Sequence, residues 1–364
     1  MERILRVGVI GANPNGSWGS VAHLPALARL PQFRTTAVST AHIETACETA
    51  KHFDIPNAFA DPRSLATHPD VDVVAIAVRV PAHKELVTIA LDAGKHVYCE
   101  WPLGKTTAEA IALRDAADAA GVMHMTGLQA RRAPAISYIR DLIAEGSIGT
   151  VREANLIHSI PWTFTGRGPS SSYLLDRESG AHFLSIPGGH SIDTLCYLLG
   201  EFTSLSATMQ TLGDEAQAFG ISKPSYNQVV IGGVLGNGVV AGIRLQGSSA
   251  FGIGVRLEIG GDRGDLIVTT VAGGRGIQMS DLKLQRTTAT GVLEDLAIPD
   301  SYFADLPASI RKNPPLNVAK AYLALHEAIT SGTAPSPNFS DAIIRHKTLD
   351  AIQQSQDEDR TITL

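Results

Sequence analysis

A glycine-rich segment near the start of the chain has the residue types that bind phosphate. Residues 11–19 read Gly-Ala-Asn-Pro-Asn-Gly-Ser-Trp-Gly and follow the short apolar run Arg6–Ile10. A dinucleotide site needs a glycine at the end of a strand, because the pyrophosphate must approach both the backbone and the amino terminus of the next helix. The spacing is longer than G-x-G-x-x-G, and an ordinary glycine-rich loop shares this composition. The strand–loop–helix context favours dinucleotide binding, with Gly11, Asn13 and Trp18 as expected contacts.

The end of the second expected strand bears on which nicotinamide dinucleotide is bound. An Asp or Glu at this place binds the ribose hydroxyls and rejects a 2′-phosphate. The residues here are Ser39 and Thr40, followed by His42 and Glu44, so the position has neither a repelling carboxylate nor a welcoming arginine. We expect Ser39, Thr40 and His42 to line the cofactor site. NAD is the expected cofactor, and NADP is the alternative.

His190 is a candidate for proton transfer. An imidazole titrates near neutrality and can therefore serve as a general base. The residue follows Gly188-Gly189, and Asp193 lies three residues further on, which places both on one helical face. Asp193 could orient His190 or cap the helix, and the alternative for His190 is a helix-start histidine bound by backbone. We predict that His190 and Asp193 are catalytic.

The elements that must position these residues alternate between strands and helices in the first part of the chain. The expected strands are Arg6–Ile10, Thr35–Ser39, Val71–Val78 and His96–Cys99. Helical spacing begins near Ser20 and returns at Glu44–Phe53, His83–Ala93 and Thr107–Ala120. Such alternation predicts an α/β Rossmann domain, a doubly wound parallel sheet, over residues 1–125.

The pattern changes after about Gly127. Strand-like runs bounded by glycines predominate, with hairpin signals at residues 236–238 and 261–264; the runs are Val151–Ser159, Gln228–Leu235, Val239–Gln246, Val255–Gly260 and Asp265–Thr270. Helices are expected at Ala133–Glu145, Leu316–Thr330 and Ser340–Gln354, the last capped by Ser340. We predict an α+β domain over residues 126–364, an open, mainly antiparallel sheet with helices on one face, for substrate binding and oligomerisation.

An ordered set of short motifs resembles the Gfo/Idh/MocA family of NAD(P)-dependent oxidoreductases over essentially the whole chain. The motifs are Val7–Gly11, His23–Leu27, Arg79–His83, Gly94–Glu100, Gly127–Pro134 and Gly188–Asp193. The long loop with Trp18, the run Ile43–Thr45, Glu100-Trp101 and Leu128-Gln129 are most similar to the branch that contains the fungal galactose-pathway repressor.

The resemblance implies further cofactor contacts, and it also shows two departures from the family pattern. The implied contacts are Ala77, Val78, His83, Glu100, Trp101 and Gln129. Trp101 stands where the family usually has the lysine of Glu-Lys-Pro, and an indole can stack or donate one hydrogen bond but cannot act as an acid or base. Ile186 stands where an acidic residue is common, four positions before His190, the histidine that often contacts the substrate hydroxyl.

Other side chains are candidates for substrate binding. Arg131 and Arg132 match a basic position of the family, although a solvated pair at a helix start has the same sequence. Trp162, Arg167 and Tyr173 lie in a Gly/Pro/Ser-rich segment that could cover a pocket or form mobile surface. His190 completes the predicted substrate contacts.

Three functions follow from these observations. The first is hydride transfer at a carbon of a sugar or glycoside. The second is an NAD-dependent glycosidase, acting by transient oxidation, elimination, water addition and re-reduction, possibly on an anionic sugar. The third is a non-catalytic dinucleotide-binding regulator, which the losses at Trp101 and Ile186 favour.

Composition and motif spacing exclude several other classes. The net charge of −6 has no basic block, so we expect no nucleic-acid partner. No long apolar run predicts a membrane helix, and the amino terminus lacks a signal-peptide pattern, so a cytoplasmic location is expected. The three cysteines are widely separated, and no His/Asp/Glu cluster has metal-ligand spacing, so we expect no metal. The resemblance implies a homodimer or homotetramer.

Overall fold

The computed structural model describes residues 3–162, 169–271, 275–287 and 290–364. The chain forms two compact units: unit 1 comprises residues 1–132 and 305–344, and unit 2 comprises residues 133–304 and 345–364. A segment late in the sequence therefore returns to the unit that contains the amino terminus. The boundary predicted between residues 125 and 126 stays a prediction about domains.

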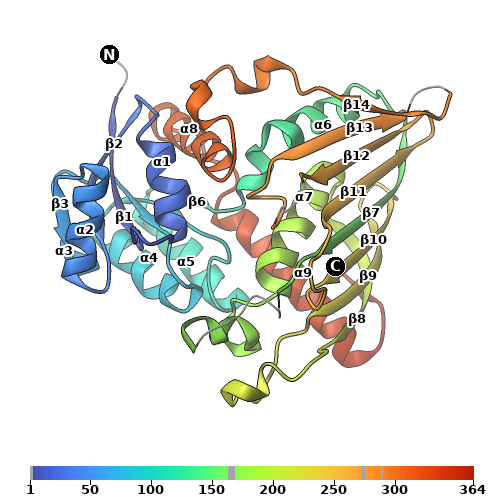
Figure 1. The fold of residues 1–364 in the computed structure, drawn as a ribbon, viewed down its shortest axis with the longest axis horizontal. Coiled ribbons are helices and arrows are strands. Elements are labelled where there is room, and N and C mark those ends of the chain that lie inside the picture. The colour runs from blue at the N-terminus through green and yellow to red at the C-terminus, as the bar shows by residue number, and fades with distance from the viewer. Residues whose placement is uncertain (1–2, 163–168, 272–274, 288–289) are drawn as a thin grey trace. The chain divides into compact units, whose positions relative to one another are not determined.

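Unit 1 is built on a parallel sheet, which confirms the predicted Rossmann class (Figure 1). The strand order is β3-β2-β1-β4-β5-β6, and all pairs are parallel. The strands are β1 (Leu5–Ile10), β2 (Phe33–Ser39), β3 (Asn57–Phe59), β4 (Val73–Ile76), β5 (His96–Cys99) and β6 (His124–Thr126). Every residue of β4 is buried, as expected for a central strand covered on both faces.

Helices join these strands, and two of them begin at side-chain caps, Asp61 and Thr106. They are α1 (Leu24–Leu27), α2 (Ile43–Phe53), α3 (Pro62–Ala66), α4 (His83–Asp92), α5 (Thr107–Ala120) and, from the returning segment, α8 (Pro315–Ser331). Thr106 Oγ1 accepts a hydrogen bond from Glu109 N at 3.2 Å before α5, which ends at Gly121 in the left-handed region.

Unit 2 contains a nine-stranded sheet of order β14-β13-β12-β11-β7-β10-β9-β8-β15. Only β7 and β10 pair in parallel among its described pairs, so the predicted mainly antiparallel class is confirmed. The bounds are β7 (Val151–Ser159), β8 (Phe202–Gln210), β9 (Gln228–Leu235), β10 (Val240–Gln246), β11 (Gly254–Gly261), β12 (Asp265–Thr270), β13 (Leu282–Thr287), β14 (Leu293–Leu296) and β15 (Ile362–Thr363).

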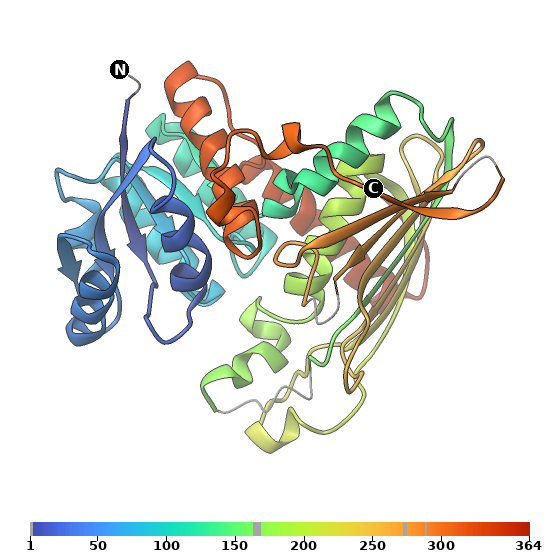
Figure 2. The same ribbon diagram turned by 45° about the horizontal axis from the view of Figure 1, so that its top comes forward.

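Helices α6 (Pro134–Ala144) and α7 (Gly189–Leu199) lie on one face of this sheet (Figure 2). The side chains of β7 and β9 alternate between buried and more exposed positions, because one face of the sheet is covered. The apolar face beneath the helices forms the core of unit 2.

The long helix α9 (Phe339–Glu358) starts differently from the prediction. Asn338, not Ser340, is its cap: Asn338 Oδ1 accepts hydrogen bonds from Ser340 N at 2.8 Å and Asp341 N at 3.2 Å. Asp341 Oδ2 in turn accepts from Asn338 N at 2.8 Å, which makes a reciprocal capping box. The predicted cap at Ser340 is wrong because Ser340 already lies within the first helical turn.

Candidate functional site

The loop after β1 has the geometry of a close backbone approach. Gly11 has φ +99°, and a Cβ added to it would lie 2.5 Å from the carbonyl oxygen of Ala77. The loop folds on Asn13, whose backbone N donates to Ser17 Oγ at 2.7 Å while its Oδ1 accepts from Asn15 N at 2.9 Å. A glycine is therefore required at position 11 by both conformation and space.

A pocket of about 360 Å³ opens beside this loop at the carboxyl ends of β1 and β2. Six of the predicted cofactor residues line it: Gly11, Asn13, Ser39, Thr40, His42 and Val78. The rest of the lining is mainly apolar and includes Ala60, Pro62 and Leu86. An apolar slot next to a glycine cradle suits a flat base joined to a phosphate, so the residues present fit a dinucleotide. Trp18, the remaining predicted contact of the loop, starts the helical segment beyond it.

Gly11→Ala tests this pocket. We expect NADH affinity to fall at least about tenfold, because the new methyl group meets Ala77 O in a backbone conformation that disfavours side chains. Gly16→Ala is the matched control, since it has φ +105° in the same loop but no atom within 4 Å of its added Cβ. Fluorescence titration of NADH measures both variants, and equal affinities for the two would contradict a role of close approach at Gly11.

The predicted contacts after β4 and β5 are mostly buried. His83 is fully buried between the loops after the two strands, with Nδ1 2.7 Å from Pro102 O and Nε2 3.2 Å from Val78 O. A neutral ring has one N–H and therefore donates to only one of these two carbonyls. Burial lowers the pKa of His83, which keeps the ring neutral. Trp101 is 4% exposed and Gln129 is 1% exposed. Together with Ala77, these residues lie just after the carboxyl ends of β4, β5 and β6.

Glu100 belongs to a polar chain that the sequence did not reveal. Its Oε1 lies 2.8 Å from Nε2 of His23, and Nδ1 of His23 lies 2.8 Å from the hydroxyl of Tyr322. His23 begins the motif His23–Leu27, but Tyr322 comes from α8 and has no local signal that could indicate this partner. All three groups lie in unit 1.

In unit 2, His190 lies at the start of α7 and is 3% exposed. The preceding turn, Leu184–Gly188, is a π-helix, a distortion that is frequent at functional sites. Asp193 Oδ1 accepts a hydrogen bond from Arg345 Nε at 3.3 Å. Asp193 is thus engaged in a buried ion pair, and its catalytic role stays a prediction.

Two further histidines of unit 2 are His158, which is buried, and His182, which is half-buried. His158, at the end of β7, has Nδ1 2.8 Å from Ser191 Oγ, the residue after His190. Burial lowers the pKa of His158 and that of His182 to about 4 each, so both rings are neutral near pH 7. The sequence offered these histidines only as single residues without a partner motif.

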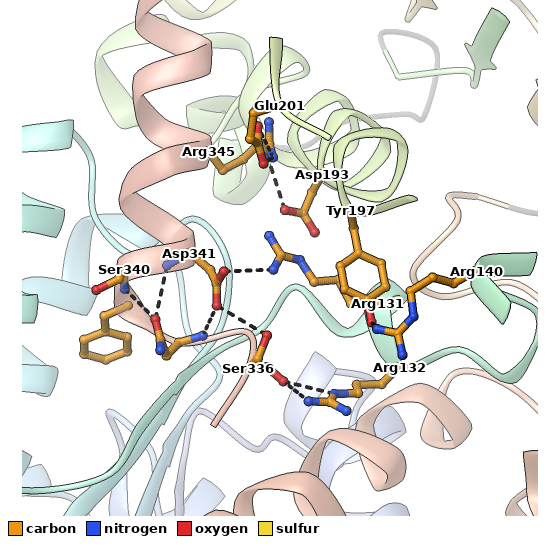
Figure 3. A network of polar contacts seen from close by, with 12 residues as sticks. Arg131, Arg132, Arg140, Asp193, Tyr197, Glu201, Ser336, Ser340, Asp341 and Arg345 are labelled. Carbon is orange, nitrogen blue, oxygen red and sulfur yellow. Dashed lines mark hydrogen bonds and ion pairs between the residues drawn. The ribbon is translucent and has the colours of Figure 1, made fainter. Parts of the chain in front are cut away.

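The predicted substrate residues of unit 1 make structural contacts. Arg131 Nη1 donates to Asp341 Oδ1 at 2.9 Å, and Arg132 Nε donates to Ser336 O at 3.0 Å (Figure 3). Both arginines therefore anchor the segment that leads into α9, and substrate binding by them stays a prediction.

The remaining predicted substrate residues belong to unit 2. Trp162 packs against Phe183 with ring centroids 5.8 Å apart, and Tyr173 lies in the short helix Pro169–Leu175. Arg167 lies outside the described residues. The structure therefore brings His190 and the buried histidine His158 into one unit, and leaves the contacts of Arg167 undescribed.

Within the described ranges, no group of three or more His, Cys, Asp or Glu residues could hold a metal ion. No helix in the same ranges combines the length and apolar character needed to cross a membrane.

Comparison with known protein families divides the chain in two. Residues 5–128 match the model of the Gfo/Idh/MocA oxidoreductase family, which describes an NAD-binding Rossmann fold. Residues 134–270 match the model of the Gal80p C-terminal domain.

Curated relatives include two dehydrogenases and a regulator. The chain is 34% identical to dehydrogenase aclE of Aspergillus oryzae over 214 residues, 57% of this chain and 58% of that protein. It is 33% identical to levoglucosan dehydrogenase of Pseudarthrobacter phenanthrenivorans over 215 residues, 57% of this chain and 54% of that protein. The galactose/lactose regulatory protein GAL80 of Kluyveromyces lactis is 29% identical over 311 residues, 78% and 67% of the two chains. The matches thus span little more than half the length of the two dehydrogenases.

Solved structures agree over nearly the whole chain. Levoglucosan dehydrogenase in complex with NADH and levoglucosan has a TM-score of 0.83 at 25% identity and covers 100% of this chain and 99% of its own. A super-repressor mutant of Gal80p from Saccharomyces cerevisiae has a TM-score of 0.83 at 21% identity, with coverage of 99% and 98%, and shows the fold alone.

Proposed function

We propose that this chain, whose residues 5–128 match the Gfo/Idh/MocA oxidoreductase family and whose residues 134–270 match the Gal80p C-terminal domain, is an NAD-dependent dehydrogenase of a sugar or glycoside. The observation that supports this most is the presence, in one chain, of the dinucleotide pocket at Gly11 and of the buried imidazole of His190. Two dehydrogenases, one of them named for levoglucosan, are among its relatives.

His190 is the residue to which we assign the proton of the substrate hydroxyl. Oxidation of a secondary alcohol breaks a C–H and an O–H bond, and bound NAD supplies the acceptor of the hydride. His190 takes up the hydroxyl proton as a general base. Neutral His158, hydrogen-bonded to Ser191, holds the first turn of α7 beneath His190. Trp101 can stack on a ligand or donate one hydrogen bond, but it cannot take up the proton, because its indole is not a base.

His190→Ala tests this assignment. We expect formation of NADH from a panel of sugars, levoglucosan and alkyl glycosides to fall at least about 100-fold, the usual contribution of a positioned general base. NADH binding is expected to be retained, because Gly11 and its pocket belong to unit 1. Absorbance of the reduced cofactor measures turnover, and unchanged activity would remove His190 from the mechanism.

A regulator is the second candidate function. The match of residues 134–270 to the Gal80p C-terminal domain and the tryptophan in place of the lysine favour it. Tight NADH binding without turnover of any substrate in the panel would support the regulator. Cleavage of a glycoside that requires NAD but accumulates no NADH would instead identify an NAD-dependent glycosidase.

Homodimer or homotetramer formation is also part of the proposal. Val230, Val234 and Val240 are 52%, 37% and 60% exposed on β9 and β10. Val234 and Val240 lie directly opposite each other in the antiparallel pair. A second copy of the sheet would cover this apolar surface.

A further inference from the structure

The polar chain in unit 1 joins three segments that are far apart in the sequence. His23 ends the π-turn Gly19–His23 that follows the dinucleotide loop, Glu100 follows β5, and Tyr322 lies in the middle of α8. His23 and Tyr322 are 0% exposed, and Glu100 is 8% exposed. Buried polar side chains are costly unless they are hydrogen-bonded, so these two contacts at 2.8 Å hold one another in place.

The direction of the hydrogen bonds follows from the chemistry of the three groups. Burial, with the nearby Glu100 charge, raises the pKa of Tyr322 well above its ordinary value, so its hydroxyl keeps its proton. The Tyr322 O–H can then donate to Nδ1 of His23, and the Nε2–H donates to the Oε1 carboxylate oxygen of Glu100. The hydrogen bond from His23 thereby holds Oε1 of the Glu100 carboxylate in place.

Packing restricts the same groups further. The His23 ring lies 5.2 Å from the Tyr98 ring and 5.7 Å from the Tyr322 ring, centroid to centroid. A Cβ added to Gly127 would lie 2.4 Å from Oε2 of Glu100, the other oxygen of the carboxylate. Position 127 must therefore be a glycine for the carboxylate to keep this orientation.

The position of Glu100 at the carboxyl end of β5 indicates a role in cofactor binding. In a doubly wound sheet, a dinucleotide lies across the carboxyl ends of the strands. The pocket of about 360 Å³ lies at the ends of β1 and β2 and extends to Val78, just after β4, which leaves the end of β5 for the nicotinamide riboside. Glu100 directly follows β5.

We propose that His23 and Tyr322 are positioning residues that hold the Glu100 carboxylate for the nicotinamide riboside half of the cofactor. The inference concerns cofactor binding and applies whether the protein is an enzyme or a regulator. The returning segment of residues 305–344 would thus contribute to the cofactor site through Tyr322, without touching the cofactor itself.

Two ligands separate this role from a general effect on folding. NADH has both halves of the dinucleotide, whereas ADP has the adenosine and both phosphates but no nicotinamide riboside. In Tyr322→Phe, which keeps the ring and removes the hydroxyl, we expect the Kd of NADH to rise about fivefold to tenfold while the Kd of ADP stays within about twofold of wild type. Isothermal titration measures both ligands.

Two variants of His23 are expected to weaken NADH binding to different degrees. His23→Gln retains an amide donor for Glu100, and His23→Leu removes it, so the Kd ratio of NADH to ADP is expected to increase from wild type to His23→Gln to His23→Leu. Phe33→Leu is the packing control, because Phe33 contacts the Tyr322 ring at 5.3 Å without joining the polar chain. Its ratio is expected to stay at the wild-type value.

The NADH and ADP titrations distinguish a positioning role of His23 and Tyr322 from a purely structural one. A parallel loss of NADH and ADP affinity in Tyr322→Phe and His23→Gln would show a purely structural role and overturn it, as would unchanged affinity for both ligands. If His23→Leu does not fold, Tyr322→Phe and His23→Gln still provide the comparison. Loss of turnover in His190→Ala has no bearing on these ratios, so the two proposals fail separately.

Discussion

Arg345→Ala is expected to lower the free energy of unfolding by about 3–5 kcal/mol, the usual cost of removing one partner of a buried ion pair. The Arg345 side chain is 0% exposed and that of Asp193 is 1% exposed. Arg345 also donates through Nη2 to both oxygens of Glu201, at 2.8 and 3.0 Å (Figure 3). Its Nη1 donates to Thr348 Oγ1 at 3.2 Å. Its loss removes the cation that faces the buried Asp193 carboxylate.

Matched variants separate the charge from the volume. Arg345→Met preserves most of the side-chain volume and is still expected to be destabilised, whereas Arg345→Met with Asp193→Asn should recover most of the loss because no unpaired charge stays buried. Arg140→Met is the control, since Arg140 is exposed and contacts the Tyr197 hydroxyl on the same helix α7. Urea unfolding measures the free energy of unfolding of wild type and of these variants. A change below about 1 kcal/mol in Arg345→Met would contradict the assignment.

The class of each sheet could be predicted because it depends on local patterns. The apolar run at Val71–Val78 indicated a strand covered on both faces, and its central part is the fully buried β4. Gly11 could be identified because a strand followed by glycine is itself a local signal. Short or weakly apolar strands were missed, among them β3 and β6. The longer β8 was missed too, although its burial alternates along most of its nine residues.

Contacts between distant segments had no comparable signal. The helix now seen as α8 is expected from its own periodicity, but nothing in that periodicity indicates that Tyr322 meets His23, 299 residues earlier. Arg131 was predicted to bind substrate because its type and place suited a polar ligand, and its ion pair with Asp341 spans 210 residues. A polar side chain predicted to bind substrate can thus instead form an ion pair with a distant residue, because the sequence does not indicate its partner.

Acidification from pH 7 to pH 5 is expected to destabilise unit 2 by about 5.5 kcal/mol, about 1.8 kcal/mol for each of three histidines. Burial lowers the pKa of His158, His182 and His346 to about 4, from an ordinary value of 6.5. Between these two values the unfolded chain binds protons that the folded chain does not, so stability falls as the pH falls. The loss of stability begins below about pH 6.5 and levels off near pH 4.

Urea unfolding followed by near-ultraviolet circular dichroism at several pH values measures how steeply the free energy of unfolding changes with pH. His346→Met should reduce that slope by up to about 1.4 kcal/mol per pH unit, whereas His52→Gln, at an exposed site of α2, serves as the control. Equal stability at pH 7 and pH 5 would contradict the lowered pKa values.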